Sequence, residues 1–455
     1  MGSPWDLACK AVGAGKSAQA TKAYHLVEDA IEEALSQRGA GVPSPEASIR
    51  YRAINPRPAT VRDVARLTLE YQDCSVHDLA LVVRDPATGL VVPHQKADSL
   101  RGLVVDVRLD LPAGGEVELE ILPGSPTLSH VGRQFCDGIQ VAMTGSDVVG
   151  AEAASALVAN DRVLESTRVR IAFEPGRGIV SWFDKVAGCE LLRDGRTHSP
   201  FLPVYDVTPV TPRHDGNPVM TRNANITSRG RMGRNRKGPD ARHYSGALRT
   251  VQVLSAGPLS STVQLDYACE GCEFYRVLLT AWADLPRVDV SVRLLKQAVW
   301  EPENLYLALP FASGGEGRNE LWVEKAGTLV RPWQDQLPDS LADFTCVQDG
   351  VVWQGKDRGV AVATPDAPLL QLGPLYYGPR PIMGSLALAG GPAQVYSWLM
   401  TNCWETNFEA TPAGFHEFTF RVEWGPHIVS PEEGHALCRA LNHGIRSFRI
   451  RSVSV

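Results

Sequence analysis

Aromatic, amide and carboxylate side chains are interleaved between Trp398 and Phe408, where the chain reads WLMTNCWETNF. Sugars bind to the faces of aromatic rings while neighbouring amide and carboxylate groups hydrogen-bond their hydroxyls. Trp398, Trp404 and Asn407 are therefore candidate carbohydrate-binding residues. The alternative is that the rings belong to the core of a β-sandwich and the polar residues to its turns.

A second group of candidates is basic and lies among glycines: Arg229, Arg231, Arg234, Arg236 and Lys237. Guanidinium groups bind phosphate, carboxylate or sugar hydroxyls well, so Arg231 and Arg234 are predicted to contact substrate. The alternative is a solvated loop. Burial of so many cations would require matching carboxylates, and Asp240 is the only acidic residue from Arg229 to Arg242. We expect the loop at the edge of a β-domain.

Cleavage of a glycoside requires two carboxyl groups about 5–9.5 Å apart. The carboxylates that could serve are these: Asp184, Glu301, Glu303, Asp366, Glu405 and Glu409. The sequence does not place any two of these carboxylates at that distance. Each of them is also typical of a turn or of an ion pair. The sequence therefore assigns no catalytic residue.

Two short motifs are typical of other chemistry but lack the context that it needs. Cys269 and Cys272 form a C-x-x-C pair without a second pair to complete a zinc site, which favours a hairpin turn. Gly13 to Ser17 (GAGKS) resembles the end of a phosphate-binding loop, but no apolar strand precedes it. We interpret it as a flexible lead-in to a helix, and no metal site is predicted.

The elements that must position these residues are mostly strands. Apolar residues alternate with charged ones from Leu103 to Leu111 and from Val117 to Ile121, around a Pro-Ala-Gly-Gly turn. The same alternation recurs in three later segments: 263–267, 288–294 and 418–424. No β-α-β spacing is present, so the prediction is a mainly β chain of antiparallel sandwiches.

Two helices are predicted beside the strands. The first covers residues 17–35, with Tyr24, Val27 and Ile31 on one face. It cannot bury that face alone, so we expect the face to be exposed or to bind a neighbour. The second has Ser430 as its N-cap and Gly444 at its end.

Four regions follow from this pattern. They are a helical segment (1–45), a small β-sandwich (46–125), a linker without a clear element (126–157) and a large β-sandwich with a C-terminal β-domain (158–455).

Composition is that of a soluble globular protein, with 44% apolar and 21% charged residues. The net charge of −6 argues against nucleic acid or a membrane as a general partner, and no apolar run reaches the ~18 residues of a membrane span. Nine cysteines and no secretory signal indicate the cytoplasm.

Several landmarks resemble the C-terminal half of the α-mannosidases of glycoside hydrolase family 38. The segment from Gly178 to Lys185 (GIVSWFDK), followed by Gly188 and Glu190, resembles the hairpin that opens the large β-domain of that family. Upstream landmarks are Asn55-Pro56 and GLVVPHQ, which ends at Gln95. Downstream landmarks are 302–311 (PENLYLALPF), 364–369 (TPDAPL) and the stretch from Trp398 to Phe408.

The resemblance implies a small sandwich followed by a galactose-mutarotase-like super-sandwich, and a mannoside as substrate. In the family, an N-terminal barrel supplies the aspartate nucleophile, and zinc is held by an early His-x-Asp pair, that aspartate and a histidine of the helical middle domain. This sequence contains no early His-x-Asp. If Trp5 to Cys9 correspond to the HDSxC stretch of the middle domain, Trp5 replaces the ligand histidine, and tryptophan cannot bind zinc. The helix at 17–35 would then be a remnant of that domain.

Two functions from different classes remain open. The chain is either the C-terminal portion of a mannosidase-type hydrolase, inactive alone, or a carbohydrate-binding or scaffolding pseudoenzyme. A truncated gene product without a function of its own is a third interpretation. No cofactor is expected in this chain, although zinc is expected in the full-length family. Expected partners are a mannoside-like glycan and either a separate catalytic-barrel chain or further copies of this chain.

Overall fold

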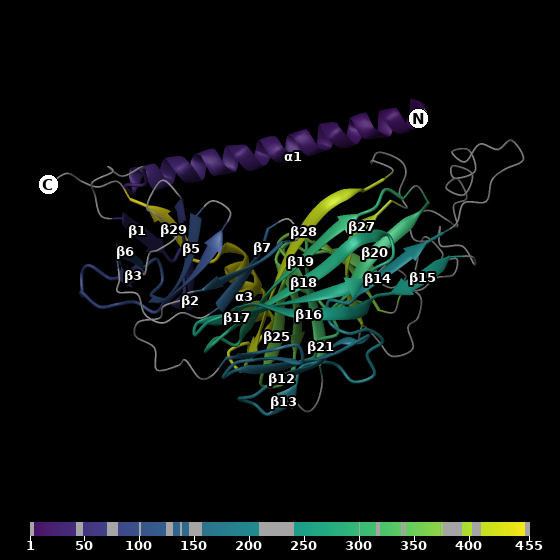
Figure 1. Cartoon of the computed structure of the whole chain (residues 1–455). Coiled ribbons are helices and arrows are strands. Elements are labelled where there is room, and N and C mark those ends of the chain that lie inside the picture. The colour runs from purple at the N-terminus through teal and green to yellow at the C-terminus, as the bar shows by residue number, and fades with distance from the viewer. Residues whose placement is uncertain are drawn as a thin grey trace, which may run out of the picture.

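Antiparallel β-sheets form most of the protein (Figure 1). The structure is a computed structural model, and it describes residues 4–41, 49–70, 81–99, 102–123, 131–136, 139–144, 157–208, 241–299, 301–314, 319–337, 340, 343–373, 375, 394–402 and 411–450. Among these residues, every pairing between strands is antiparallel. The predicted fold class, mainly β with antiparallel sandwiches, is confirmed.

Two facing sheets make the small sandwich. One has the strand order β29 (Arg446–Arg449), β1 (Ile49–Ile54), β6 (Glu116–Pro123) and β3 (Leu81–Arg84). The other has the order β2 (Val61–Glu70), β5 (Gly102–Leu111) and β4 (His94–Ser99). Alternate residues such as Leu67, Val105 and Leu119 are fully buried between them, as the period-two pattern predicts.

The last strand comes from the far end of the chain. Tyr51 of β1 pairs with Arg449 of β29, so β29 extends the small sandwich. The sequence pattern instead groups these residues with the large β-region. A pairing across so many residues leaves no trace in the local pattern of β29, since register depends on the partner strand.

A hairpin occupies part of the predicted linker. Strands β7 (Val131–Cys136) and β8 (Ile139–Thr144) pair with each other, and β7 lies against β16. The absence of a clear element, expected for 126–157, is therefore wrong for these residues. Their strands depend on neighbours elsewhere in the chain more than on local propensity.

Three sheets make the large β-region. The first has five strands: β13 (Cys189–Glu190), β12 (Gly178–Asp184), β11 (Val169–Glu174), β10 (Val163–Glu165) and β9 (Val158–Ala159). The second has six: β15 (Arg242–Ser245), β14 (Pro203–Val207), β20 (Glu303–Ala308), β27 (Val395–Thr401), β26 (Leu369–Leu372) and β23 (Phe344–Cys346). The third has nine: β16 (Ala247–Ala256), β17 (Ser260–Ala268), β18 (Cys272–Trp282), β19 (Arg287–Lys296), β28 (Gly414–Gly425), β25 (Gly359–Ala363), β24 (Gly350–Gln354), β21 (Glu320–Lys325) and β22 (Thr328–Val330).

Aromatic rings fill the centre of this region. Trp182 is fully buried and meets Phe311 and Trp424 edge-to-face, with ring centroids 5.3 Å and 6.4 Å apart. These residues come from β12, the segment after β20, and β28. One apolar core therefore joins the sheets.

Helix α3 (Pro431–His443) lies where the sequence predicts it. Ser430 Oγ accepts a hydrogen bond from the Glu433 amide at 3.3 Å, and Gly444 follows the helix with φ 63°. Its buried face packs Cys438 and Leu441 on Val352 of β24 and on β25.

Helix α1 (Pro4–Gln37) is longer than predicted and includes Gly13 to Ser17. The flexible lead-in expected there is wrong, as each helical glycine costs only about 1 kcal/mol relative to alanine. The helix lies as a separate rod along one side of the β-sheets (Figure 1). Tyr24 is 62% exposed and Val27 57% exposed, which confirms the predicted exposed face. Near its C-terminal end, Leu35 packs on β1 and β29 residues.

Candidate functional site

Only one of the five predicted sugar-binding residues lies in the described part of the chain. Trp404, Asn407, Arg231 and Arg234 lie outside the described residues. Trp398 lies on β27 and is 3% exposed; its Nε1 donates to Asn304 Oδ1 at 3.1 Å and its ring stacks on Tyr306. Its faces are covered by the core, which matches the sandwich-core alternative.

Buried polar side chains of β20 and its neighbours form a network of contacts that includes Trp398. Asn304 donates to Asp206 Oδ1 at 2.7 Å, and the neighbouring Glu303 accepts from the Tyr205 hydroxyl at 2.5 Å. Lys296 Nζ lies 2.7 Å from the same Glu303 carboxylate, and both side chains are at most 2% exposed. Burial, followed by the Glu303 charge, raises the pKa of Tyr205 far above its ordinary value. The network joins β14, β19, β20 and β27 and serves their packing.

Two further carboxylates named from the sequence, Asp184 and Asp366, also have structural partners. Asp184 accepts from the amides of Val186 and Ala187 at a hairpin tip and pairs with Arg358. Asp366 accepts from the Thr419 amide at 2.9 Å. Glu405 and Glu409 lie outside the described residues.

The two cysteines of the C-x-x-C motif lie where β17 turns into β18, as the hairpin interpretation predicts. Among the described residues, no group of three or more histidine, cysteine, aspartate or glutamate side chains is placed to hold a metal ion. We derive no chemical step through zinc.

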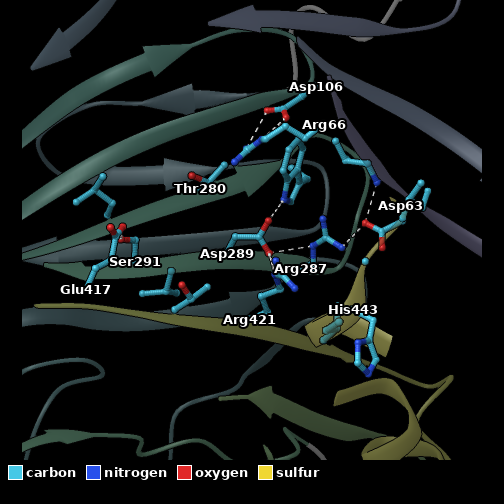
Figure 2. A pocket seen from close by; sticks show the side chains of 18 of the residues that line it. Asp63, Arg66, Asp106, Thr280, Arg287, Asp289, Ser291, Glu417, Arg421 and His443 are labelled. Carbon is cyan, nitrogen blue, oxygen red and sulfur yellow. Dashed lines mark hydrogen bonds and ion pairs between the residues drawn. The ribbon is translucent and has the colours of Figure 1, made fainter. Parts of the chain in front are cut away.

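A polar cleft of about 430 Å³ lies between the small sandwich and the nine-stranded sheet (Figure 2). Its floor is the outward face of three adjacent strands, β18, β19 and β28. Residues of β2 and β5 form one wall, and the end of α3 with the segment that follows forms another. This volume lies within the ~300–1,000 Å³ that is usual for small-molecule sites.

Every second side chain of β18, β19 and β28 points toward the cleft, because side chains alternate between the two faces of a strand. Asp289 of β19 lies opposite Thr280 of β18 on one side and Arg421 of β28 on the other. One step along, Ser291 lies between Leu278 and Thr419. The opposite faces of these strands carry the apolar core, so the polar residues must face the cleft.

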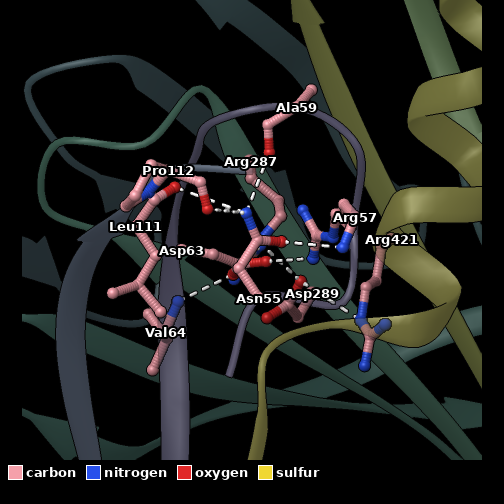
Figure 3. Close-up of polar contacts among 10 residues, drawn as sticks. All are labelled: Asn55, Arg57, Ala59, Asp63, Val64, Leu111, Pro112, Arg287, Asp289 and Arg421. Atoms are coloured by element: carbon pink, nitrogen blue, oxygen red, sulfur yellow. Dashed lines mark hydrogen bonds and ion pairs between the residues drawn. The ribbon is translucent and has the colours of Figure 1, made fainter. Parts of the chain in front are cut away.

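Several charged residues that line the cleft belong to one ion network (Figure 3). Asp63 accepts from Arg57 and from Arg287, each at 2.6 Å. Burial by itself raises the pKa of Asp63. The Arg287 charge and hydrogen bond, the Val64 amide and the Arg57 charge outweigh burial and lower this pKa to about 2.

Asp289 and Arg421 complete the network. Asp289 Oδ1 lies 3.1 Å from Arg287 Nε, and its Oδ2 accepts from Trp282 Nε1 at 2.9 Å. Arg421 Nε lies 3.9 Å from Asp289 Oδ1, which is beyond hydrogen-bond distance. Burial lowers the pKa of Arg421.

This cleft is not predicted from the sequence. Its signal was present as the polar positions of 288–294 and 418–424, which carry Asp289, Ser291, Thr419 and Arg421. Alternate polar positions normally face water, and only the sheet order places these two strands side by side under the small sandwich.

Comparison of the sequence with protein-family models and with curated proteins finds no match. The structure is similar to that of an α-mannosidase from Enterococcus faecalis V583, with a TM-score of 0.55 at 10% identity over 93% of this chain and 48% of that chain. A protein of glycosyl hydrolase family 38 from Enterococcus faecalis has the same TM-score and identity, over 93% and 50% of the two chains. The chain thus spans about half the length of these proteins.

The likeness to these glycoside hydrolases is one of fold. A galactose mutarotase related enzyme from Lactobacillus acidophilus matches at a TM-score of 0.28, with 12% identity over 58% of this chain and 97% of that chain. That score is too low to support an argument.

In the described part of the chain, neither helix combines the length and apolar character needed to cross a membrane.

Proposed function

We propose that this chain is the C-terminal β-portion of an α-mannosidase-like glycoside hydrolase that acts on mannosides. The observation that carries the proposal is the fold match over 93% of the chain to about half of an α-mannosidase. The order of the landmarks between Asn55 and Phe408 supports it.

In this proposal the chain does not cleave glycosides by itself. The carboxylates of Asp184, Glu303 and Asp366 are engaged in turns, ion pairs and backbone contacts. A general acid and a nucleophile facing one substrate are both required for cleavage. A catalytic barrel, with its zinc, would work together with these β-domains in the cytoplasm.

The exposed face of α1 supports a protein partner of this kind. Tyr24 and Val27 present apolar surface that no described part of the chain covers, on a helix of 34 residues. In the proposal, the catalytic part of the enzyme covers this face. A second copy of the chain is the alternative occupant, which the oligomeric state in solution would reveal.

A non-catalytic carbohydrate-binding or scaffolding protein is the alternative function. In this alternative, the β-sheets bind a glycan without an associated catalytic barrel. The residues that contact the mannoside-like glycan are then Trp404, Asn407, Arg231 and Arg234. The two functions predict different results when the chain is isolated from its own cells. The first predicts that α-mannosidase activity is isolated with it, and the second predicts that none is.

The test uses an affinity-tagged chain prepared from two sources. The chain from an unrelated host, assayed with an aryl α-mannoside and added zinc, is expected to show no turnover above background. The chain recovered from its own cells is expected to carry α-mannosidase activity that a chelator abolishes. Activity in both preparations would show a complete active site in this chain, and activity in neither would favour the scaffolding function.

A further inference from the structure

Charged side chains of both signs line the cleft between the small sandwich and the nine-stranded sheet. Four arginines line it: Arg66, Arg287, Arg293 and Arg421. Four carboxylates line it as well: Asp63, Asp106, Asp289 and Glu417. The numbers are equal, so the pairing among these groups decides which charge remains available to a ligand.

Three of the arginines have carboxylate partners at close range. Arg66 Nε donates to Asp106 Oδ1 at 2.9 Å, and Arg293 Nε donates to Glu417 Oε1 at 2.9 Å. Arg287 bridges two carboxylates, Asp63 at 2.6 Å and Asp289 at 3.1 Å. Asp63 is also shared with Arg57, a cation outside the cleft lining.

Arg421 is the arginine that this pairing leaves over. Its contact with Asp289 is 3.9 Å long, and Asp289 already faces Arg287 and Trp282. The guanidinium is partly desolvated, with 29% of its side chain exposed. After burial, the charges of Asp289 and Arg287 act on it in opposite senses, and so do those of Asp63 and Arg66. A partly buried cation in this state is stabilised by an anion that can accept two hydrogen bonds.

Hydroxyl groups and a carboxylate follow Arg421 along the same floor. Thr419 precedes it by two residues on β28, and Ser291 lies opposite Thr419. Ser291 donates to Glu417, whose side chain is 40% exposed and retains acceptor capacity. His443 lies on the α3 wall (Figure 2). Such neutral and acidic groups suit the hydroxyls of a polyol.

We propose that this cleft binds an anionic monosaccharide, a sugar acid or sugar phosphate, with its anionic group on Arg421 and its hydroxyls on Thr419, Ser291 and Glu417. All of these side chains belong to described residues. Binding of a ligand in this cleft does not require the catalytic barrel of the proposed function.

Isothermal titration calorimetry at low salt tests the proposal with four probes: glucuronate, glucose 6-phosphate, neutral glucose and inorganic phosphate. The intact chain is expected to bind glucuronate or glucose 6-phosphate at least about tenfold more tightly than glucose or inorganic phosphate, since one charge-assisted hydrogen bond is worth about 1.5–3 kcal/mol. Preference between the two anionic sugars identifies the anion. Equal binding of glucose would overturn the anionic anchor, and equal binding of inorganic phosphate would overturn the role of the hydroxyls.

Variants locate the site. Arg421→Gln is expected to weaken the preferred probe about tenfold or more, whereas Arg177→Gln, which removes a 67% exposed arginine from the β11–β12 hairpin, is expected to leave the affinity unchanged. Thr419→Val removes a hydroxyl without touching an ion pair and is expected to weaken binding several-fold, so the test survives if Arg421→Gln fails to fold. The proposal is refuted if the folded variants bind with unchanged affinity. It is also refuted if neither anionic sugar shows saturable binding to the intact chain.

Discussion

At the scale of single residues, two carboxylates of the segment from Gly178 to Glu190 hold the backbone of its hairpin in place through hydrogen bonds. Glu190 Oε1 accepts hydrogen bonds from the Trp182 and Leu192 amides at 2.7 Å and 3.1 Å, which closes the turn that the hairpin motif encodes. Asp184 caps the tip of the same hairpin. These carboxylates stabilise the backbone around the aromatic core, so their side chains are occupied rather than open to substrate.

The buried pair of Lys296 and Glu303 gives a test at this scale. Lys296→Met is expected to lower the free energy of unfolding by about 3–5 kcal/mol, because it leaves the Glu303 carboxylate buried without its cation. Lys185→Met removes an exposed partner of Glu165 and should cost at most about 1 kcal/mol. Urea denaturation of both variants measures the difference, and equal losses would contradict the role of burial.

The lowered pKa of Asp63 predicts how stability depends on pH. Its pKa falls from 3.8 when unfolded to about 2 when folded, so the contribution is complete above the unfolded value and is lost as pH falls through the folded value. The full contribution is about 2 kcal/mol, of which about 1 kcal/mol is lost by about pH 3.

Asp63→Asn is the matched variant, since it cannot titrate. The stability gap between the intact chain and Asp63→Asn, measured by denaturation from about pH 6 down to about pH 3, is expected to narrow by about 1 kcal/mol. A gap that stays constant or widens would show that Asp63 is not held ionised by Arg287 and Arg57.

At the scale of elements, helix α3 illustrates local encoding. Ser430 caps its first turn, and Glu433 Oε2 reaches back to accept from the Val429 amide at 3.1 Å. Ser430→Ala is expected to cost about 1 kcal/mol of stability. Thermal unfolding checks this, with Glu432→Ala as a first-turn control that removes no capping side chain. An equal effect of both variants would mean that the cap contributes nothing specific.

Helix α1 behaves in the opposite way. Most of its surface contacts no other described residue and remains exposed. A helix of this kind is marginal in water unless something packs on it. The stability of the β-sheets should therefore be independent of its exposed side chains.

At the scale of the whole molecule, Gln95 joins the small sandwich to the nine-stranded sheet. Its Oε1 accepts from the Leu259 and Ser260 amides at 3.0 Å, and its Nε2 donates to the Ser260 carbonyl at 3.2 Å. A Cβ on Gly257 would lie 2.4 Å from the Gln95 amide carbon, so the glycine makes room for this contact.

Gln95→Ala is expected to destabilise the protein by about 2 kcal/mol, because the buried Ser260 amide and the partly buried Leu259 amide lose their acceptor. Gln297→Ala, at an exposed position, should change stability by less than about 0.5 kcal/mol. Denaturant unfolding of the two variants provides the comparison. Equal stability of both would mean that the contact between the two β-regions depends on other residues.

The sequence by itself determined the elements whose signals are local. Alternation predicts the strands from Leu103 to Leu111 and from Val117 to Ile121, and the capping residues predict α3, because side-chain direction and helix ends depend on near neighbours in the chain. The landmark order also led to the fold relationship that the comparison of structures bears out.

Only the tertiary structure decided what covers each strand face. The pattern of β27 is compatible with either an exposed or a buried Trp398, and the choice depends on Tyr306 and Phe344 from other segments. The cleft likewise requires β19 and β28 to pair although more than a hundred residues separate them in the chain. Such contacts depend on register and sheet order, and a period of two reveals that a strand has two faces without revealing its neighbours.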